Sequence, residues 1–130
     1  MAKFIIQGGN PISGTFHPRG NKNAVLPMLA ASVLTDQPVT LHNVPLINDV
    51  LVMLELLEAL GVEVSLRDHT VTLCAGSLRT TELDRELCAK VRTSILLAGP
   101  LAACHGSATI HPPGGDVIGR RRLDTHFYGL

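Results

Sequence analysis

The alternation of helix-type and strand-type segments constrains the fold of this chain more than any other feature of its sequence. Two segments have the composition or the apolar spacing of helices, and short β-rich runs stand before, between and after them. A polar turn between the last two runs is typical of a β-hairpin. The sequence therefore predicts an α/β fold in the order βαβαββ: strand 3–7, helix 24–34, strand 39–44, helix 48–60, and hairpin strands 62–66 and 70–73.

The remainder of the chain has the pattern of a second, incomplete unit. Residues 86–104 predict one long helix, kinked near Gly99-Pro100, and residues 108–111 predict a strand. The phrase Val39-Thr40-Leu41-His42 recurs as Ala108-Thr109-Ile110-His111, each time after a helix and before a proline-containing loop. Another helix is expected to start near Arg122, but the hairpin that should follow it is missing. The pattern is that of a fragment, about one and a half units long.

Composition excludes several classes of protein. The 11 basic and 11 acidic side chains cancel and only 3% of residues are aromatic, so nucleic-acid binding is not expected. A hydrophobic content of 45% excludes disorder. No apolar run reaches the roughly 18–20 residues of a membrane span, and no signal peptide is recognisable, so the predicted location is cytoplasmic. The histidines and cysteines lack the spacing of metal ligands, and no metal or cofactor is predicted.

Two segments combine glycine with positive charge next to a predicted helix. Residues 19–23 place Lys22 at a helix N-terminus, where backbone N–H groups favour a phosphate or a carboxylate. Residues 112–122 form a glycine-rich loop that leads into three arginines, an arrangement that suits a phosphate or diphosphate. The loop matches neither a Walker A motif nor a GxGxxG fingerprint. A capped helix with a solvated lysine, and a solvated basic patch, are the alternative interpretations.

Arg92 is a charged residue within the otherwise apolar helix predicted over residues 89–97. Such a group needs a partner or an anionic ligand, unless it projects into solvent. On a continuous helix Lys90 points in another direction, so the two cations do not belong to one polar face.

Three separated segments and one helix pattern together resemble the UDP-N-acetylglucosamine enolpyruvyl transferase family, over nearly the whole chain. A relative, the shikimate-pathway enolpyruvyl transferase, typically has a GSKS-type lysine loop and an NSGTT-type segment, and this sequence has neither. The matching motifs are Gly20-Asn21-Lys22-Asn23-Ala24 with Leu26-Pro27, Val91-Arg92-Thr93-Ser94 with Gly99-Pro100-Leu101, Pro113-Gly114-Gly115 through Asp124-Thr125-His126, and Ile47-Asn48-Asp49-Val50.

The resemblance implies an activity and an architecture. The family transfers the enolpyruvyl group of phosphoenolpyruvate to the 3-hydroxyl of UDP-N-acetylglucosamine and releases phosphate, the first committed step of peptidoglycan synthesis. Its inside-out α/β barrel has two domains, each of three βαβαββ units, with the active site in the cleft between them. Residues 1–20 would be a strand and linker that join the second domain, and residues 21–130 an incomplete first domain. Unpaired sheet edges would then associate with the remainder of the enzyme or with another copy.

Site residues are assigned by the same resemblance. Lys22 and Asn23 would contact phosphoenolpyruvate, with Lys22 neutralising its charge, and Arg121 would also lie close to it. Arg92 would line the anionic cleft, and residues 121–125 would hold the uridine and diphosphate end of the sugar nucleotide: Arg121, Arg122, Leu123, Asp124 and Thr125. Arg120 and Arg122 depart from the family pattern, which has alanine and proline there. The catalytic set would comprise Asp116, Lys22 and Arg121.

Asp116 stands where most members of that family carry a cysteine. Addition of the sugar hydroxyl needs a proton at the methylene carbon of phosphoenolpyruvate, and a protonated carboxyl group can act as that general acid. Loop closure and substrate charge would favour the protonated form, whereas nearby arginines would oppose it. The sequence therefore predicts insensitivity to fosfomycin, which alkylates the loop cysteine. A catalytically incomplete sugar-nucleotide-binding module, a shikimate-type transferase and a purely structural module are the alternatives.

Overall fold

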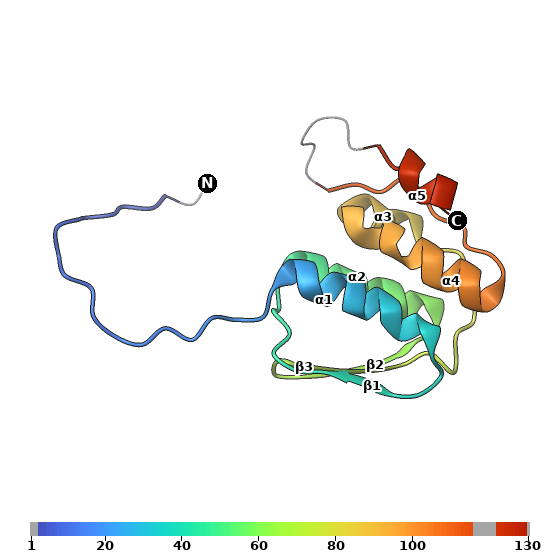
Figure 1. Ribbon diagram of the computed structural model, residues 1–130, viewed down its shortest axis with the longest axis horizontal. Coiled ribbons are helices and arrows are strands. Elements are labelled where there is room, and N and C mark those ends of the chain that lie inside the picture. Colours follow the sequence, from blue (N-terminus) through green and yellow to red (C-terminus); the bar gives the residue numbers. More distant parts are fainter. Residues whose placement is uncertain (1–2, 116–121, 130) are drawn as a thin grey trace.

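The computed structural model describes residues 3–115 and 122–129, and these contain helices, short 3-10 turns and one small sheet (Figure 1). The sheet lies along one side of helices α1 and α2, with α3 and α4 on the other side of that pair. The elements in chain order are α1 (Lys22–Ala31), η1 (Ser32–Leu34), β1 (Val39–Leu41), α2 (Asn48–Leu60), β2 (Glu63–Arg67), β3 (Thr70–Cys74), α3 (Arg85–Lys90), η2 (Arg92–Leu97), α4 (Ala98–His105) and α5 (Asp124–Gly129).

The sheet is antiparallel in the order β1-β3-β2, and its hairpin is the one predicted from the sequence. Asp68 adopts a positive φ of 51° in the hairpin turn, which closes β2 onto β3. β1 is shorter than the predicted strand because Asn43, with a φ of 57°, turns the chain away. Val71 and Leu73 of β3 are fully buried, so this strand carries the face of the sheet that meets the helices.

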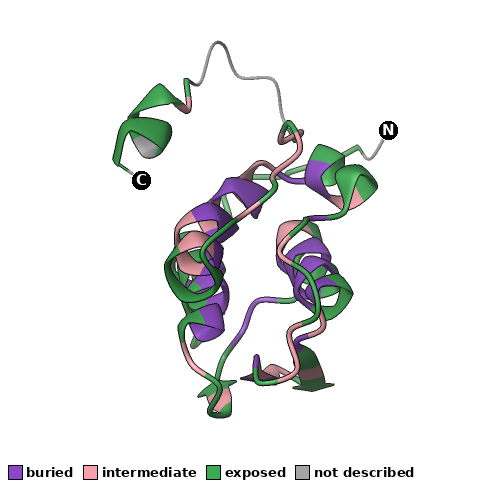
Figure 2. Cartoon of the chain, turned by 90° about the vertical axis from the view of Figure 1, so that its right-hand side faces the viewer, coloured by how far each residue is buried: buried purple, intermediate pink, exposed green. Residues whose placement is uncertain are grey.

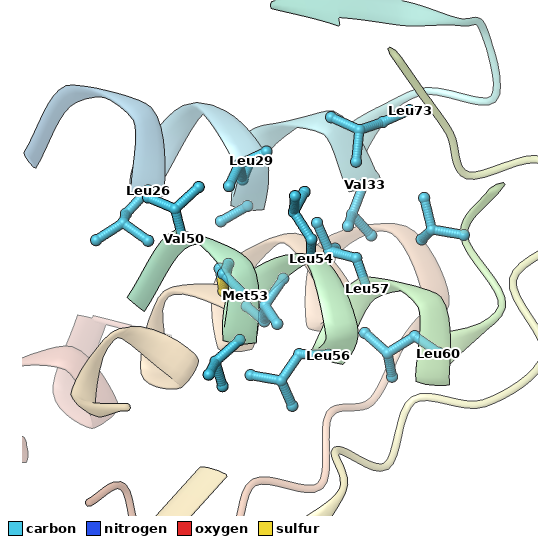
Figure 3. Packing of buried hydrophobic residues seen from close by; sticks show 14 of the residues in the cluster. Leu26, Leu29, Val33, Val50, Met53, Leu54, Leu56, Leu57, Leu60 and Leu73 are labelled. Atoms are coloured by element: carbon cyan, nitrogen blue, oxygen red, sulfur yellow. The ribbon is translucent and has the colours of Figure 1, made fainter. Parts of the chain in front are cut away.

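The hydrophobic core fills the space between the helices and the inner face of the sheet. Figure 2 shows buried residues gathered between the helices, whereas α5 is exposed. In Figure 3, side chains of α1 and α2 interleave, and Leu29, Met53 and Leu57 have no solvent exposure. Burying a side chain of this size contributes roughly 1.5–3 kcal/mol, so this contact makes a large contribution to the stability of the fold.

The ends of α1 and α2 are fixed by the residues that the sequence predicted. The Asn21 side chain accepts a hydrogen bond of 3.1 Å from the Ala24 amide, which caps the start of α1. Gly61 ends α2 in the left-handed conformation, with a φ of 99°, and its amide donates to the Glu58 carbonyl. Both predicted helices are therefore confirmed, and α2 has the predicted bounds.

The single long helix predicted over residues 86–104 is wrong. α3 ends at Lys90, and Val91 is extended, with φ −135° and ψ 141°. The Gly114 amide donates to the Cys88 carbonyl at 2.9 Å, so that carbonyl bonds a distant loop at the point where a helix would continue. The expected kink is absent because Pro100 lies in the first turn of α4, where a missing N–H costs little.

Two predicted strands are also corrected. Residues 3–7 extend away from the body without a strand, and Phe4, Ile5 and Ile6 are 85–88% exposed, because no described strand lies beside them to complete a ladder (Figure 1). The strand predicted at 108–111 is reduced to one parallel bridge between Thr109 and Glu82. The helix expected from Arg122 begins at Asp124 as α5. The described part of the first unit is thus αβαββ.

Gly20 is the point at which the loop after β1 crosses the start of α1. A Cβ atom on Gly20 would lie 1.9 Å from the Asn43 carbonyl oxygen and 3.1 Å from Cδ of Pro45. No side chain fits at such a distance from a backbone oxygen, so the crossing requires glycine. The contact holds the loop that leads into α2 against the residue before the α1 cap, and so brings the two helix starts together.

We therefore expect Gly20→Ala to lower the free energy of unfolding by about 1–3 kcal/mol, because the added methyl group forces the two backbone segments apart. Urea unfolding followed by circular dichroism measures the change. Gly8→Ala is the matched control, since a Cβ there meets nothing within 4 Å. Equal stability of the two variants would contradict the proposed role of the crossing.

Candidate functional site

A cleft of about 660 Å³ opens where the starts of α1 and α2 face the break between α3 and η2. Polar and charged side chains from four separate stretches of the chain border it, together with a few apolar ones. The residues that line the cleft are Lys22, Asn23, Asn48, Asp49, Lys90, Val91, Arg92, Thr93, Ile95, Leu96, Gly115, Arg122 and Leu123.

The first side of the cleft is formed by the opening turns of α1 and α2. Asn21 caps α1, which places Lys22 and Asn23 in its first turn at the cleft edge. Asp49 lies in the first turn of α2, and its carboxylate forms an ion pair with the Lys22 ammonium. The positive ends of two helix dipoles converge here, an environment that favours an anion.

The second side of the cleft results from the break at Val91. Lys90 ends α3 and Arg92 begins η2, and because the intervening residue is extended both cations border the cleft. The expectation that Lys90 points elsewhere assumed a continuous helix and is wrong. The Thr93 hydroxyl oxygen is buried at the same wall and has no hydrogen-bond partner among the described residues. It is a donor or acceptor placed beside the cations.

The start of the glycine-rich loop is held against this break. A Cβ atom on Gly114 would lie 1.6 Å from the Ala89 carbonyl oxygen, so the loop backbone touches the backbone of α3 directly. Gly115 has a φ of 87°, and a Cβ there would come within 3.2 Å of the Arg92 amide nitrogen. Glycine is needed at the first position for the close approach and at the second for the backbone conformation. The start of the loop, at Gly114 and Gly115, therefore lies next to Arg92.

Some of the site residues assigned by resemblance meet in the cleft. Lys22, Asn23, Arg92, Arg122 and Leu123 line it together, although they come from separate parts of the sequence. The Arg122 guanidinium Nε lies 3.7 Å from a carboxylate oxygen of Asp124, whereas neither Asp124 nor Thr125 lines the cleft. Asp116 and Arg121 lie outside the residues that the structure describes, as does Arg120.

Four further residues line the cleft although the sequence pattern assigned them no role: Asn48, Asp49, Lys90 and Thr93. Asn48 and Asp49 start α2, and the motif at residues 47–50 carried the resemblance without an assigned function. Thr93 was also part of a motif, and Lys90 was noted only for its direction. These residues share one feature. Each stands at or next to the end of a helix, and in the fold these helix ends face one another. Four cations and one carboxylate line the cleft in the described chain, so it suits an anion that carries several negative charges.

The comparisons with known proteins bear on this geometry. A model of the EPSP synthase (3-phosphoshikimate 1-carboxyvinyltransferase) family matches residues 6–130. The chain belongs to this family. The structure of this chain resembles that of the enolpyruvyl transferase NikO from Streptomyces tendae, with a TM-score of 0.70. The two sequences are 28% identical, and the match covers 78% of this chain and 24% of that one. The predicted α/β fold, in the form of a partial unit, is confirmed.

Curated relatives of this EPSP synthase family member carry the name UDP-N-acetylglucosamine 1-carboxyvinyltransferase. The protein from Treponema denticola is 50% identical over 100% of this chain and that from Treponema pallidum is 53% identical over the same share, and both matches cover 31% of the relative. The protein from Bradyrhizobium diazoefficiens is 50% identical over 98% of this chain. The chain thus spans about 31% of the length of the curated relatives it matches. The resemblance drawn from the motifs is confirmed.

Two further observations concern only the part of this family member that the structure describes. None of its helices combines the length and the apolar character required to cross a membrane. No three side chains of the metal-binding types, histidine, cysteine, aspartate or glutamate, come together there in a way that would hold a metal ion.

We expect Gly114→Ala to detach the start of the loop from α3, because a methyl group cannot occupy the space of the Ala89 carbonyl. The amide of residue 114 should then exchange its hydrogen at least about tenfold faster, since its bond to the Cys88 carbonyl is lost. Hydrogen exchange followed by NMR measures this. The Leu83 amide, which donates to Thr109 at 3.0 Å, is the internal reference and should keep its protection. Unchanged exchange at residue 114 would show that the contact tolerates a side chain.

Proposed function

We propose that this chain is part of an enzyme that transfers the enolpyruvyl group of phosphoenolpyruvate to the 3-hydroxyl of UDP-N-acetylglucosamine, with release of phosphate. The observation that carries the proposal is the cleft, in which Lys22, Lys90, Arg92 and Arg122 meet around two helix starts. Both substrates are phosphate-bearing anions, and such a site suits them. The names of the curated relatives support the same reaction. We place the protein in the cytoplasm, as part of peptidoglycan synthesis.

Lys22, Asn23, Arg92, Arg122 and Leu123 line the cleft, and this position supports the roles proposed for them. Lys22 and Asn23, at the start of α1, contact phosphoenolpyruvate, and Lys22 neutralises its phosphate and carboxylate. Arg92, at the second wall of the cleft, binds the anionic groups of the substrates, and Arg121 acts with it. Arg122 and Leu123 hold the uridine and diphosphate end of the sugar nucleotide, together with Asp124 and Thr125. The helix break at Val91 supports this division, because it brings Lys90 and Arg92 to the same cleft.

Asp116 is the proposed general acid. It lies in the loop whose start, at Gly114 and Gly115, is held beside Arg92. Its carboxyl group delivers a proton to the methylene carbon of phosphoenolpyruvate while the sugar hydroxyl attacks the neighbouring carbon. The attacking hydroxyl gives up its own proton as the C–O bond forms. The adduct then loses phosphate together with a proton from the new methyl group, which restores the C=C bond of the enolpyruvyl product. No net change in oxidation state occurs in these steps, so the reaction requires no redox cofactor.

The chain supplies only part of this machinery. We propose that residues 21–130 belong to one domain of the enzyme, and that residues 1–20 pair with another part of it. The exposed Phe4, Ile5 and Ile6 support this, since an apolar extended segment is stabilised by joining a sheet. The experiment must therefore place these residues within a complete enzyme.

A chimaera tests the activity: this chain replaces the matching segment of the Treponema denticola relative. We expect phosphate release from phosphoenolpyruvate that depends on UDP-N-acetylglucosamine, measured by a coupled phosphate assay. Lys22→Met should lower kcat/KM by at least about a hundredfold, because it removes a charge-assisted contact to the reacting substrate. Arg67→Met is the matched control, a cation on the exposed hairpin outside the cleft, and should keep full activity.

The chimaera experiment separates the alternatives. Binding of UDP-N-acetylglucosamine without phosphate release would identify a catalytically incomplete binding module. A folded chimaera that neither binds the sugar nucleotide nor releases phosphate would overturn the proposal. Release with shikimate 3-phosphate instead would identify a shikimate-type transferase.

We expect Asp116→Asn in the same chimaera to abolish turnover while binding of UDP-N-acetylglucosamine stays within about twofold, because the amide cannot donate the required proton. Turnover comes from the phosphate assay and binding from calorimetry. Fosfomycin should fail to inactivate the chimaera covalently, whereas Asp116→Cys should restore sensitivity. An active asparagine variant would remove Asp116 from its role.

A further inference from the structure

Lys22 is paired in the structure with a carboxylate that has no place in the proposed reaction. The Lys22 ammonium forms an ion pair with Asp49, which joins the start of α1 to the start of α2. Both side chains remain partly exposed, at 45% for Lys22 and 34% for Asp49. An ion pair this exposed contributes little to stability, so stability alone does not account for a carboxylate in an anion cleft.

Asp49 is the exception in the charge pattern of the cleft. Among the described residues that line it, Asp49 has the sole carboxylate, and it shares the cleft with Lys22, Lys90, Arg92 and Arg122. A negative charge among these cations opposes the binding of any other anion. Asp49 also stands in the first turn of α2, so it is held at the start of that helix. The carboxylate is therefore a fixed feature of the site.

An anion that binds at Lys22 must share the ammonium group with Asp49 or displace it. The lysine side chain is long and presents three donors, so both arrangements are open to it. In either arrangement part of the interaction between Lys22 and the ligand replaces an interaction that already exists. The free energy gained when Lys22 binds an anion is therefore smaller than the gain from a lysine that has no ion-pair partner.

We infer that Asp49 is an internal counter-ion that positions Lys22 and lowers the affinity of the cleft for phosphate. This deepens the proposed function and rests on it, because an enzyme that releases phosphate must not hold its product tightly. The inference concerns the affinity for the ion itself, so it can be tested without turnover.

The test is the binding of inorganic phosphate to the 130-residue chain, followed by NMR at constant ionic strength. Asp49→Asn should bind phosphate about fivefold more tightly, the gain expected when Lys22 no longer has to leave a partly exposed ion pair. Asp49→Glu keeps the charge and should stay within about twofold of the unaltered chain. Glu55→Gln is the matched control, because it removes the same charge from the exposed face of the same helix and should change nothing.

A double variant tests whether Asp49 acts through Lys22. In a Lys22→Met background, Asp49→Asn should give a clearly smaller gain in phosphate affinity, because only the repulsion between the carboxylate and the ion is then relieved. An equal gain in both backgrounds would show that the carboxylate acts by repulsion alone, and would overturn the positioning role. Weaker binding by Asp49→Asn, equal binding by all variants, or no binding by any of them would overturn the inference as well.

The outcomes for the inference and for the proposed function are distinguishable. A chimaera without transferase activity, combined with the predicted gain in phosphate affinity, would overturn the function and leave the counter-ion in place. An active chimaera would support the proposed function. If its Asp49→Asn form also showed the same KM and kcat, with unchanged phosphate affinity, the counter-ion role would be overturned. Thermal unfolding of each variant identifies any affinity change that reflects loss of folded protein.

Discussion

The backbone contact between Gly114 and the end of α3 is the constraint on which the cleft depends. It engages the Cys88 carbonyl with a distant amide, and the chain leaves helical geometry at Val91. This break turns Lys90 and Arg92 toward the same space, and it fixes the start of the glycine-rich loop beside Arg92. On a continuous helix the side chains of Lys90 and Arg92 would point in different directions, because residues two positions apart do not share a helix face. The chemistry of the site thus follows from one close approach of two backbone segments.

The opposite wall depends on a different balance, between helix dipoles and side-chain charge. The crossing at Gly20 brings the starts of α1 and α2 together, so two positive helix ends and Lys22 meet. Without a carboxylate this wall would attract any anion strongly. Asp49 reduces that attraction and joins the two helices at the same time. The binding strength of the cleft is therefore set by opposed charges on one wall, whereas its shape is set by glycine contacts.

The sequence predicted those parts of the fold that depend on local rules. α2 has a regular apolar spacing and a glycine at its end, and the hairpin after it has a polar turn, so both were predicted with nearly the right bounds. The strand at 3–7 failed because a strand depends on a partner that local sequence does not supply. The break at Val91 failed for a similar reason, since a loop more than twenty residues away causes it. In the candidate site, resemblance identified Lys22 and Arg92, but the places of Lys90 and Asp49 follow only from packing.

The two glycine crossings lie in corresponding regions of the internal repeat, although their residues do not match position by position. In the internal repeat, His111 stands at the position equivalent to His42. By the same offset, Ala89 is equivalent to Gly20 and Gly114 is equivalent to Pro45. In the first unit the glycine is on the helix side of the crossing, and in the second it is on the loop side. Two backbone segments approach this closely when either partner lacks a side chain. In each unit a glycine therefore allows a loop to cross close to a helix end, at Asn43 and Gly20 in the first and at Gly114 and Ala89 in the second, while the position of the glycine differs.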